Sequence, residues 1–242
     1  MTETPRRKTT LWQLLPNLIT VGALCAGLTA VRLATEGRFG LAVALIIVAA
    51  LMDGLDGRIA RFLKSESEIG AELDSLCDFV NFGVAPGLVI YLWALQDMRS
   101  EGWIAALVYT VACLLRLARF NVGSRDPDRD SANFQGVPSP MGAMLVLAPI
   151  FLAKALGDGA PIAPIGIALW MAFCGALMVA RFPTPSFKKI SFKTEMVSFV
   201  VLGFVVLAAA LVNYPWQTLA LLDALYLLVL LASFVPRKPK TS

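Results

Sequence analysis

Four aspartates lie close together in an otherwise hydrophobic part of this sequence. They are Asp53, Asp56, Asp74 and Asp78, all within 26 residues, and apolar segments flank the stretch on both sides. Charged side chains at membrane depth cost free energy and usually serve a function. Four carboxylates at short range also repel one another, so they need compensating positive charge at neutral pH. Hard divalent cations such as Mg²⁺ and Mn²⁺ prefer oxygen ligands, and the cluster therefore predicts a site for one or two such ions.

The spacing of the aspartates places them on two helices. Asp53 and Asp56 are three residues apart, and Asp74 and Asp78 are four residues apart. Residues at these spacings share one face of a helix. The segment 62–69 between the pairs is short, so the two helices are expected to be antiparallel neighbours. Each helix then brings two carboxylates toward the other, close to the membrane surface.

Small and basic residues surround the acidic ones. Gly54 and Gly57 remove side chains where a bulky ligand, such as a nucleotide pyrophosphate, could approach the helix backbone. An alternative is that the aspartates only pair with Arg58 and Arg61, and that glycines such as Gly70 only allow close helix packing. That alternative leaves the free-energy cost of four clustered charges unexplained.

Composition identifies the class of protein that carries this cluster. Of the 242 residues, 57% are hydrophobic and 16% are charged, whereas soluble domains carry about a quarter charged residues. The chain is therefore expected to be an integral membrane protein. Histidine is absent, which excludes a histidine base, nucleophile or metal ligand. The four cysteines, at positions 25, 77, 113 and 174, lack metal-ligand spacing and are expected to be free thiols.

Hydrophobic runs of about 17–25 residues predict an all-α, polytopic membrane bundle of about eight helices. Their expected ranges are 16–34, 39–61, 70–96, 102–120, 138–157, 161–181, 195–213 and 215–235. Residues 1–15 are expected to form a cytoplasmic or interfacial segment, with a short helix over 9–15. Residues 16–194 are expected to form a membrane core of about six helices that contains the aspartate cluster. Residues 195–242 add two helices, in which nothing indicates chemistry, and a basic tail.

The distribution of basic residues predicts the orientation. Of the 21 lysines and arginines, 17 lie in the N-terminal segment, around 58–64, in 116–129, in 181–193 and in the C-terminal tail. Short cytoplasmic loops are enriched in these residues, so both termini and the aspartate cluster are expected on the cytoplasmic side. The net charge of +4 is explained by this orientation and by anionic headgroups, and no nucleic-acid partner is expected.

The spacing of the cluster resembles the signature of the CDP-alcohol phosphotransferases at every fixed position. The matching residues are Asp53, Asp56, Gly57, Ala60, Arg61, Gly70, Asp74 and Asp78. The resemblance implies that the four aspartates hold Mg²⁺ or Mn²⁺, which grips the pyrophosphate of a CDP-linked substrate. It implies that Gly57, Ala60 and Gly70 make room for the cytidine nucleotide and that Arg61 contacts phosphate. It also implies that Asp78 is the general base.

Looser motifs bear on the acceptor substrate. PNLIT at 16–20 resembles the start of the first helix in the family, and RLARFNVGS at 116–124, FQGVPSPMGA at 134–143 and PTPSFKK at 183–189 resemble its bacterial phosphatidylserine synthase branch. This resemblance implies transfer of the phosphatidyl group from CDP-diacylglycerol to L-serine in a bacterial inner membrane, with release of CMP. It also implies a homodimer.

The acceptor residues and the acceptor itself stay open at this point. Arg116 and Arg119, followed by Asn121, could bind the carboxylate of serine, or they could simply contact lipid headgroups. Weaker candidates are Gln135, Ser139 and Lys188. Choline, glycerol phosphate or an inositol compound are alternative acceptors within the family. A transporter that uses membrane carboxylates and a purely structural subunit are alternatives from other classes.

Overall fold

A computed structural model describes residues 11–63, 65, 67–124, 136–157, 162–180 and 197–234. Within these ranges all regular structure is helical. The helices are α1 (Leu11–Thr35), α2 (Phe39–Leu63), α3 (Glu68–Asp78), η1 (Phe79–Val84), α4 (Ala85–Ile90), η2 (Tyr91–Leu95), η3 (Gln96–Met98), α5 (Arg99–Ser124), α6 (Ser139–Ala155), α7 (Pro164–Val179), α8 (Val197–Asn213) and α9 (Pro215–Phe234). Five helical segments are long and apolar enough to cross a membrane, and three apolar helices are shorter. The prediction of a polytopic helical membrane protein is confirmed.

The first helix begins earlier than the sequence predicts. Residues 11–15 belong to α1, which continues through Pro16 to Thr35, so the described part of 9–15 is not a separate helix. Proline removes one backbone donor, and the loss of a single hydrogen bond does not end a helix of 25 residues. The prediction of a separate interfacial helix is therefore wrong for residues 11–15.

The third span is one continuous helical segment from α3 to η3. Its α-helical parts are interrupted by the π-helical turns η1 and η2, and it ends in the 3₁₀-helical turn η3. Pro86 explains part of this irregularity, because it has no N–H to donate to the carbonyl of Phe82 four residues earlier. The hydroxyl of Tyr109 in α5 donates to that carbonyl instead, at 2.7 Å. Tyr109 is fully buried. A neighbouring helix thus satisfies a backbone group that lipid could not hydrogen-bond.

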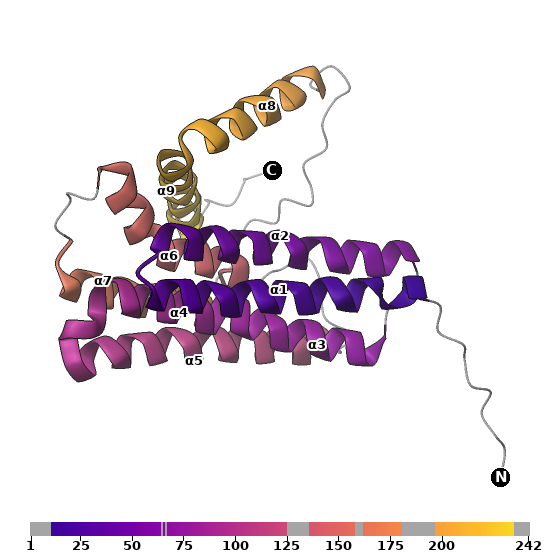
Figure 1. The fold of residues 1–242 in the computed structure, drawn as a ribbon, viewed down its shortest axis with the longest axis horizontal. Helices are drawn as coiled ribbons and strands as arrows, with labels where there is room; N and C mark the ends of the chain where they lie inside the picture. Colours follow the sequence, from indigo (N-terminus) through magenta and orange to yellow (C-terminus); the bar gives the residue numbers. More distant parts are fainter. Residues whose placement is uncertain are drawn as a thin grey trace, which may run out of the picture.

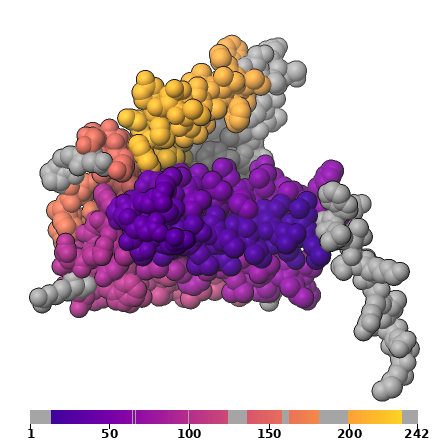
Figure 2. Space-filling view, viewed as in Figure 1, coloured from indigo at the N-terminus to yellow at the C-terminus, as the bar shows by residue number. Residues whose placement is uncertain are grey.

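The helices pack into an elongated bundle with two helices set against it. In Figure 1, α1 and α2 run antiparallel along the long axis, and they are in extensive contact. Helix α3 packs mainly against α1, α5 packs against α7, and α6 packs against both α7 and α9. The space-filling view in Figure 2 shows α8 and α9 as a ridge that projects from the main body. None of residues 199–213 in α8 is buried, and the main contact of this helix is with α9.

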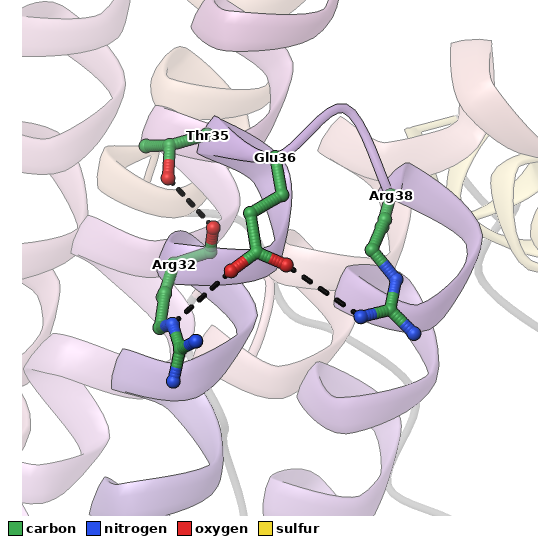
Figure 3. Close-up of polar contacts among 4 residues, drawn as sticks. All are labelled: Arg32, Thr35, Glu36 and Arg38. Atoms are coloured by element: carbon green, nitrogen blue, oxygen red, sulfur yellow. Dashed lines mark hydrogen bonds and ion pairs between the residues drawn. The ribbon is translucent and has the colours of Figure 1, made fainter.

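The turn between α1 and α2 lies at the end of the bundle opposite the aspartates, and Gly37 adopts a φ of +74° there. Glu36 bridges two arginines across this turn (Figure 3): its carboxylate lies 3.2 Å from Nε of Arg32 and 3.5 Å from Nη1 of Arg38. All three side chains are exposed, so the ion pairs add little stability. Glu36 offsets one of the two positive charges that Arg32 and Arg38 place outside the predicted cytoplasmic side.

Candidate metal and substrate site

Three of the four predicted metal ligands converge in the folded chain. Asp53 and Asp56 lie near the end of α2, and Asp74 lies in α3. One carboxylate oxygen from each lies within 4.8 Å of the other two. Asp56 is buried, and the other two aspartates are half-buried. Three hard oxygen donors at this range suit a divalent cation, and they repel one another strongly without one.

The fourth aspartate, Asp78, lies one turn deeper along α3 and outside this group of three. Its carboxyl interacts most directly with Asp53, and also with Asp74 and with Arg116 of α5. Its Oδ1 is buried and has no hydrogen-bond partner among the described residues. A buried, unsatisfied carboxyl oxygen is costly, and it is suited to accept a proton or a ligand that the isolated chain does not supply.

Thr20 in α1 adds a contact that the sequence analysis did not assign. Its hydroxyl lies 2.6 Å from Oδ2 of Asp56 and 3.0 Å from the carbonyl of Pro16. A hydroxyl has one hydrogen to donate, and the shorter contact is the one to the carboxylate. This hydrogen bond fixes the orientation of the Asp56 carboxylate within the acidic group.

The start of α3 explains the position of its two aspartates. Ser67 is the N-cap, and its hydroxyl accepts a hydrogen bond from the backbone N–H of Gly70 at 3.0 Å. A Cβ on Gly70 would lie 3.1 Å from Oδ1 of Asn17 in α1 and 3.0 Å from Oγ of Ser67. Glycine at position 70 therefore permits the cap and the close contact of α3 with α1. The prediction that α2 and α3 are direct neighbours needs this refinement, because α3 packs mainly on α1.

The glycines of α2 differ from Gly70 in their surroundings. A Cβ on Gly54 or on Gly57 would meet no atom within 4 Å. Both positions are exposed and face open space beside Asp53 and Asp56. This is the arrangement expected where a bulky ligand approaches the backbone.

Basic residues do not neutralise the acidic cluster in the described part of the chain. No ion pair joins any of the four aspartates to a lysine or arginine among these residues. The Nε of Arg61 donates to the carbonyl of Gly57 in its own helix, at 3.1 Å. Lys64 lies outside the described residues. The alternative that Arg58 and Arg61 pair with the aspartates is thus not supported by the geometry.

Arg116 of α5 is the predicted acceptor residue that lies closest to this chemistry. Its guanidinium interacts with Asp78 and donates through Nη1 to the hydroxyl of Ser139 at the start of α6. Its Nε is buried and has no hydrogen-bond partner within the described ranges. The group is also 5.9 Å from the ring centroid of Phe120. A half-buried guanidinium whose Nε has no partner among the described residues is suited to bind a carboxylate or phosphate.

The other two predicted acceptor residues contact the protein itself. Nη1 of Arg119 donates to the carbonyl of Val179 at the end of α7, at 2.8 Å. The side-chain amide of Asn121 donates to the hydroxyl of Ser75 in α3, at 2.6 Å. Arg119 thus joins α5 to α7, and Asn121 joins α5 to α3. Gln135, Lys188 and the segment 183–189 lie outside the described residues.

Comparison with known proteins identifies the family. The family model described as CDP-alcohol phosphatidyltransferase matches residues 13–180, which contain the four aspartates, Arg116, Arg119 and Asn121. The chain belongs to the CDP-alcohol phosphatidyltransferase family. A second model, CDP-alcohol phosphatidyltransferase 2, matches residues 195–230.

Named relatives of this family member come from bacteria of different genera. The chain is 38% identical over 231 residues to the CDP-diacylglycerol–serine O-phosphatidyltransferase of Mycobacterium leprae, covering 94% of this chain and 77% of that one. It is 31% identical over 218 residues to the protein of that name from Helicobacter pylori, covering 89% and 88%. The fold is similar to that of Mycobacterium tuberculosis phosphatidylinositol phosphate synthase with CDP-DAG bound, with a TM-score of 0.53 and 21% identity over 69% of this chain and 84% of that one.

Helix α9 contributes residues to this CDP-alcohol phosphatidyltransferase that the sequence analysis missed. Tyr226 interacts electrostatically with Arg116, so the last helix reaches the predicted acceptor region. Asp223 is 5% exposed and lies one turn away. A single acidic residue in the middle of the final hydrophobic span was the available signal. For Thr20, the available signal was its place in the PNLIT motif.

Proposed function

We propose that this chain transfers the phosphatidyl group of CDP-diacylglycerol to the hydroxyl of L-serine, giving phosphatidylserine and CMP. Family membership and the shared name of relatives at 31–38% identity support the proposal. The observation that carries it is the proximity of Asp78 to Arg116, two half-buried groups of opposite charge that each keep one buried atom without a hydrogen-bond partner among the described residues.

We assign the acidic cluster to a divalent metal, Mg²⁺ or Mn²⁺. The ligands are oxygens of Asp53, Asp56 and Asp74, which lie within 4.8 Å of one another, and Asp78 is the adjacent fourth carboxylate. The donor set fits a hard cation. When bound, such an ion neutralises charge that develops on the leaving phosphate and orients the pyrophosphate.

The nucleotide half of the donor substrate is assigned to the open side of α2. Gly57 faces free space, and Ala60, three residues later in α2, lies on the same face of that helix. Arg61 is exposed and available to contact phosphate. Gly70 has a different role in this proposal, because Ser67 and Asn17 already fill the space beside it. It permits helix packing and so positions Asp74 and Asp78.

Serine binds in this proposal with its carboxylate on Arg116 and its hydroxyl toward Asp78. Arginine can hold a carboxylate through two donors, and Nε of Arg116 is free to provide one of them. The serine oxygen attacks the phosphorus that carries diacylglycerol, and a new P–O bond forms. The P–O bond to CMP breaks, its electron pair leaves with CMP, and the serine proton passes to Asp78.

The distribution of lysine and arginine supports a cytoplasmic site in a bacterial inner membrane. Seventeen of the 21 basic residues belong to the segments on the aspartate side, as the positive-inside rule expects. CDP-linked substrates and serine are water-soluble at their reacting ends, so a site at the cytoplasmic ends of α2 and α3 meets both lipid and cytosol. A homodimer stays a prediction from the family resemblance.

A CMP-release assay on the purified protein tests the proposal. With CDP-diacylglycerol and Mg²⁺ or Mn²⁺, L-serine is expected to release CMP, whereas choline, glycerol 3-phosphate and inositol are not. A quaternary ammonium gains nothing from Arg116, but a phosphorylated acceptor could use it as well as serine does, so the direct comparison is needed. Turnover with another acceptor alone would reject serine. Absence of turnover with every acceptor would reject the enzyme assignment.

A further inference from the structure

An apolar cavity of about 360 Å³ lies between α6, α7 and α9, away from the aspartate cluster. Its size falls within the range of small-molecule pockets. Its walls are hydrophobic apart from one group, the carboxyl of Asp223. The lining includes Leu145 and Leu152 of α6, Gly166 and Trp170 of α7, and Asp223 and Ala224 of α9.

Asp223 lies at the middle of a membrane span, and one of its carboxyl oxygens has no hydrogen-bond partner among the described residues. It is the ninth residue of the 18-residue span Pro215–Ala232. The residue is 5% exposed, and its Oδ2 forms no hydrogen bond with any described residue. The thiol of Cys174 in α7 interacts with it electrostatically, but a thiol is only a weak donor. An unsatisfied carboxyl at this depth is costly and marks a functional site.

The walls of the cavity are fixed by the helices themselves. Pro149 in α6 cannot donate to the carbonyl of Leu145 four residues earlier. The indole N–H of Trp170 in α7 donates to that carbonyl at 2.7 Å. Leu145, Pro149 and Trp170 all line the cavity, so the residues that hold α6 against α7 also shape it. The described residues of these walls provide no hydrogen-bond donor to Oδ2 of Asp223.

The rim of the cavity reaches the outer surface of the described bundle. Leu152 is 45% exposed, and Gly166 and Ala224 are exposed as well. A Cβ on Gly166 would meet no atom within 4 Å. At membrane depth such a rim faces acyl chains, so an occupant enters from the bilayer.

We propose that this cavity binds a neutral lipid alcohol, with the hydrocarbon against the apolar walls and the hydroxyl on the carboxyl of Asp223. The hydrocarbon walls exclude a charged headgroup, and one carboxyl suits one hydrogen-bond donor. Moving an ammonium into this setting costs far more than moving a hydroxyl. Diacylglycerols and long-chain alcohols share the required chemistry.

Thermal unfolding of the purified full chain tests the proposal, with 1-decanol as the probe. Bound ligand stabilises the folded state, so saturating 1-decanol is expected to raise the unfolding midpoint by about 2–4 °C. Decane tests the need for the hydroxyl, and decylamine tests the preference for a neutral donor. A titration with dioleoylglycerol in nanodiscs then shows whether the cavity binds diacylglycerols as well as long-chain alcohols.

Three variants localise the effect. Asp223→Leu removes the carboxyl and is expected to fold and to lose the response to 1-decanol. Gly166→Leu fills the cavity from α7 and is expected to lose it too. Gly203→Leu in α8 is the matched control, because a Cβ there also meets no atom within 4 Å and position 203 does not line the cavity; its response should equal that of the wild type.

These measurements test the alcohol site independently of the enzyme assignment, because they contain no CDP-linked substrate. No shift in the wild type, an equal shift with decane, or an unchanged shift in Asp223→Leu each rejects a hydroxyl site on Asp223. A larger shift with decylamine rejects the neutral alcohol in favour of a cation. A response in both variants with substitutions at the cavity would place the binding of 1-decanol elsewhere.

Discussion

The hydroxyl of Thr20 lies 2.6 Å from Oδ2 of Asp56, and this contact joins α1 to the acidic cluster across 36 positions of sequence. Asp56 is the most buried aspartate of the three that converge. Groups that hydrogen-bond a metal ligand orient it and affect metal affinity about 10–100-fold. The first helix thus takes part in the site, although it carries no acidic residue.

Replacement of Thr20 tests this relationship. Thr20→Val keeps the shape of the side chain but removes the hydroxyl, so we expect the metal concentration for half-maximal CMP release to rise about 10–100-fold. Thr20→Ser keeps the donor and should stay close to the wild type. Equal metal dependence in all three proteins would show that the contact does not tune the site.

Asp56→Asn and Asp78→Asn should differ in their kinetic signature. Asp56 lies in the group of three, so its neutralisation should mainly weaken activation by Mg²⁺ or Mn²⁺. Asp78 lies outside that group and close to Arg116, so its loss should lower kcat by about 10²–10⁴-fold if it removes the serine proton. Titration of the metal at saturating serine separates the two effects. Near-normal turnover in both variants would remove the proposed mechanism.

Arg116 and Arg119 are both candidates by sequence, and the structure predicts different consequences for them. Arg116→Lys loses the planar fork beside Asp78, so the KM for serine is expected to rise at least about tenfold, with a smaller change in the KM for CDP-diacylglycerol. Arg119→Lys keeps a donor toward the carbonyl of Val179 and should leave the KM for serine nearly unchanged. The reverse pattern would assign the acceptor carboxylate to Arg119.

Gly57→Leu tests whether the open space on α2 belongs to the nucleotide. Because no atom lies within 4 Å of the added Cβ, the side chain should not destabilise the fold, and leucine favours a helix over glycine by up to about 1 kcal/mol. We expect an unchanged or higher unfolding midpoint together with a strong loss of CDP-diacylglycerol binding. A variant that is both stable and fully active would show that the nucleotide lies elsewhere.

Tyr109→Phe tests the hydrogen bond that compensates for Pro86. The change leaves the buried carbonyl of Phe82 without its 2.7 Å donor, and we expect a loss of about 1–3 kcal/mol in the free energy of unfolding. Thr110→Val is the control, because Thr110 is only part-buried and its contact with the carbonyl of Gly83 is longer, at 3.4 Å. Unfolding in detergent micelles measures both, and the larger loss should come from Tyr109.

Much of this arrangement is predictable from local properties of the chain. Hydrophobic run length predicts a membrane helix because a span must cover the bilayer core, and each of the eight predicted spans contains helix among its described residues. The spacing of Asp53 and Asp56, and of Asp74 and Asp78, predicts a shared face on each of two helices and a metal site between them. Both features depend on residues that are close together along one helix, so they can be predicted from the sequence alone.

Contacts between helices that are distant in sequence cannot be predicted from local patterns in this way. No local pattern shows that Thr20 reaches Asp56, that Asn17 packs on Gly70, or that Tyr109 compensates for Pro86. The roles of Arg116 and Arg119 diverge for the same reason, since only packing places one beside Asp78 and turns the other toward the end of α7. Side chains on apolar helices have many energetically similar packing partners.

The sequence by itself therefore determined the class of protein, the number of helices and the residues of the acidic cluster, because each depends on composition or on spacing within a helix. Only the tertiary structure decided which carboxylates meet and which arginine lies near them. It also decided that Asp223 of the last helix lines a cavity between α6, α7 and α9, with one carboxyl oxygen that forms no hydrogen bond within the described ranges. Those outcomes depend on how whole helices pack in three dimensions, and helix packing is set by shape complementarity that a linear pattern does not record.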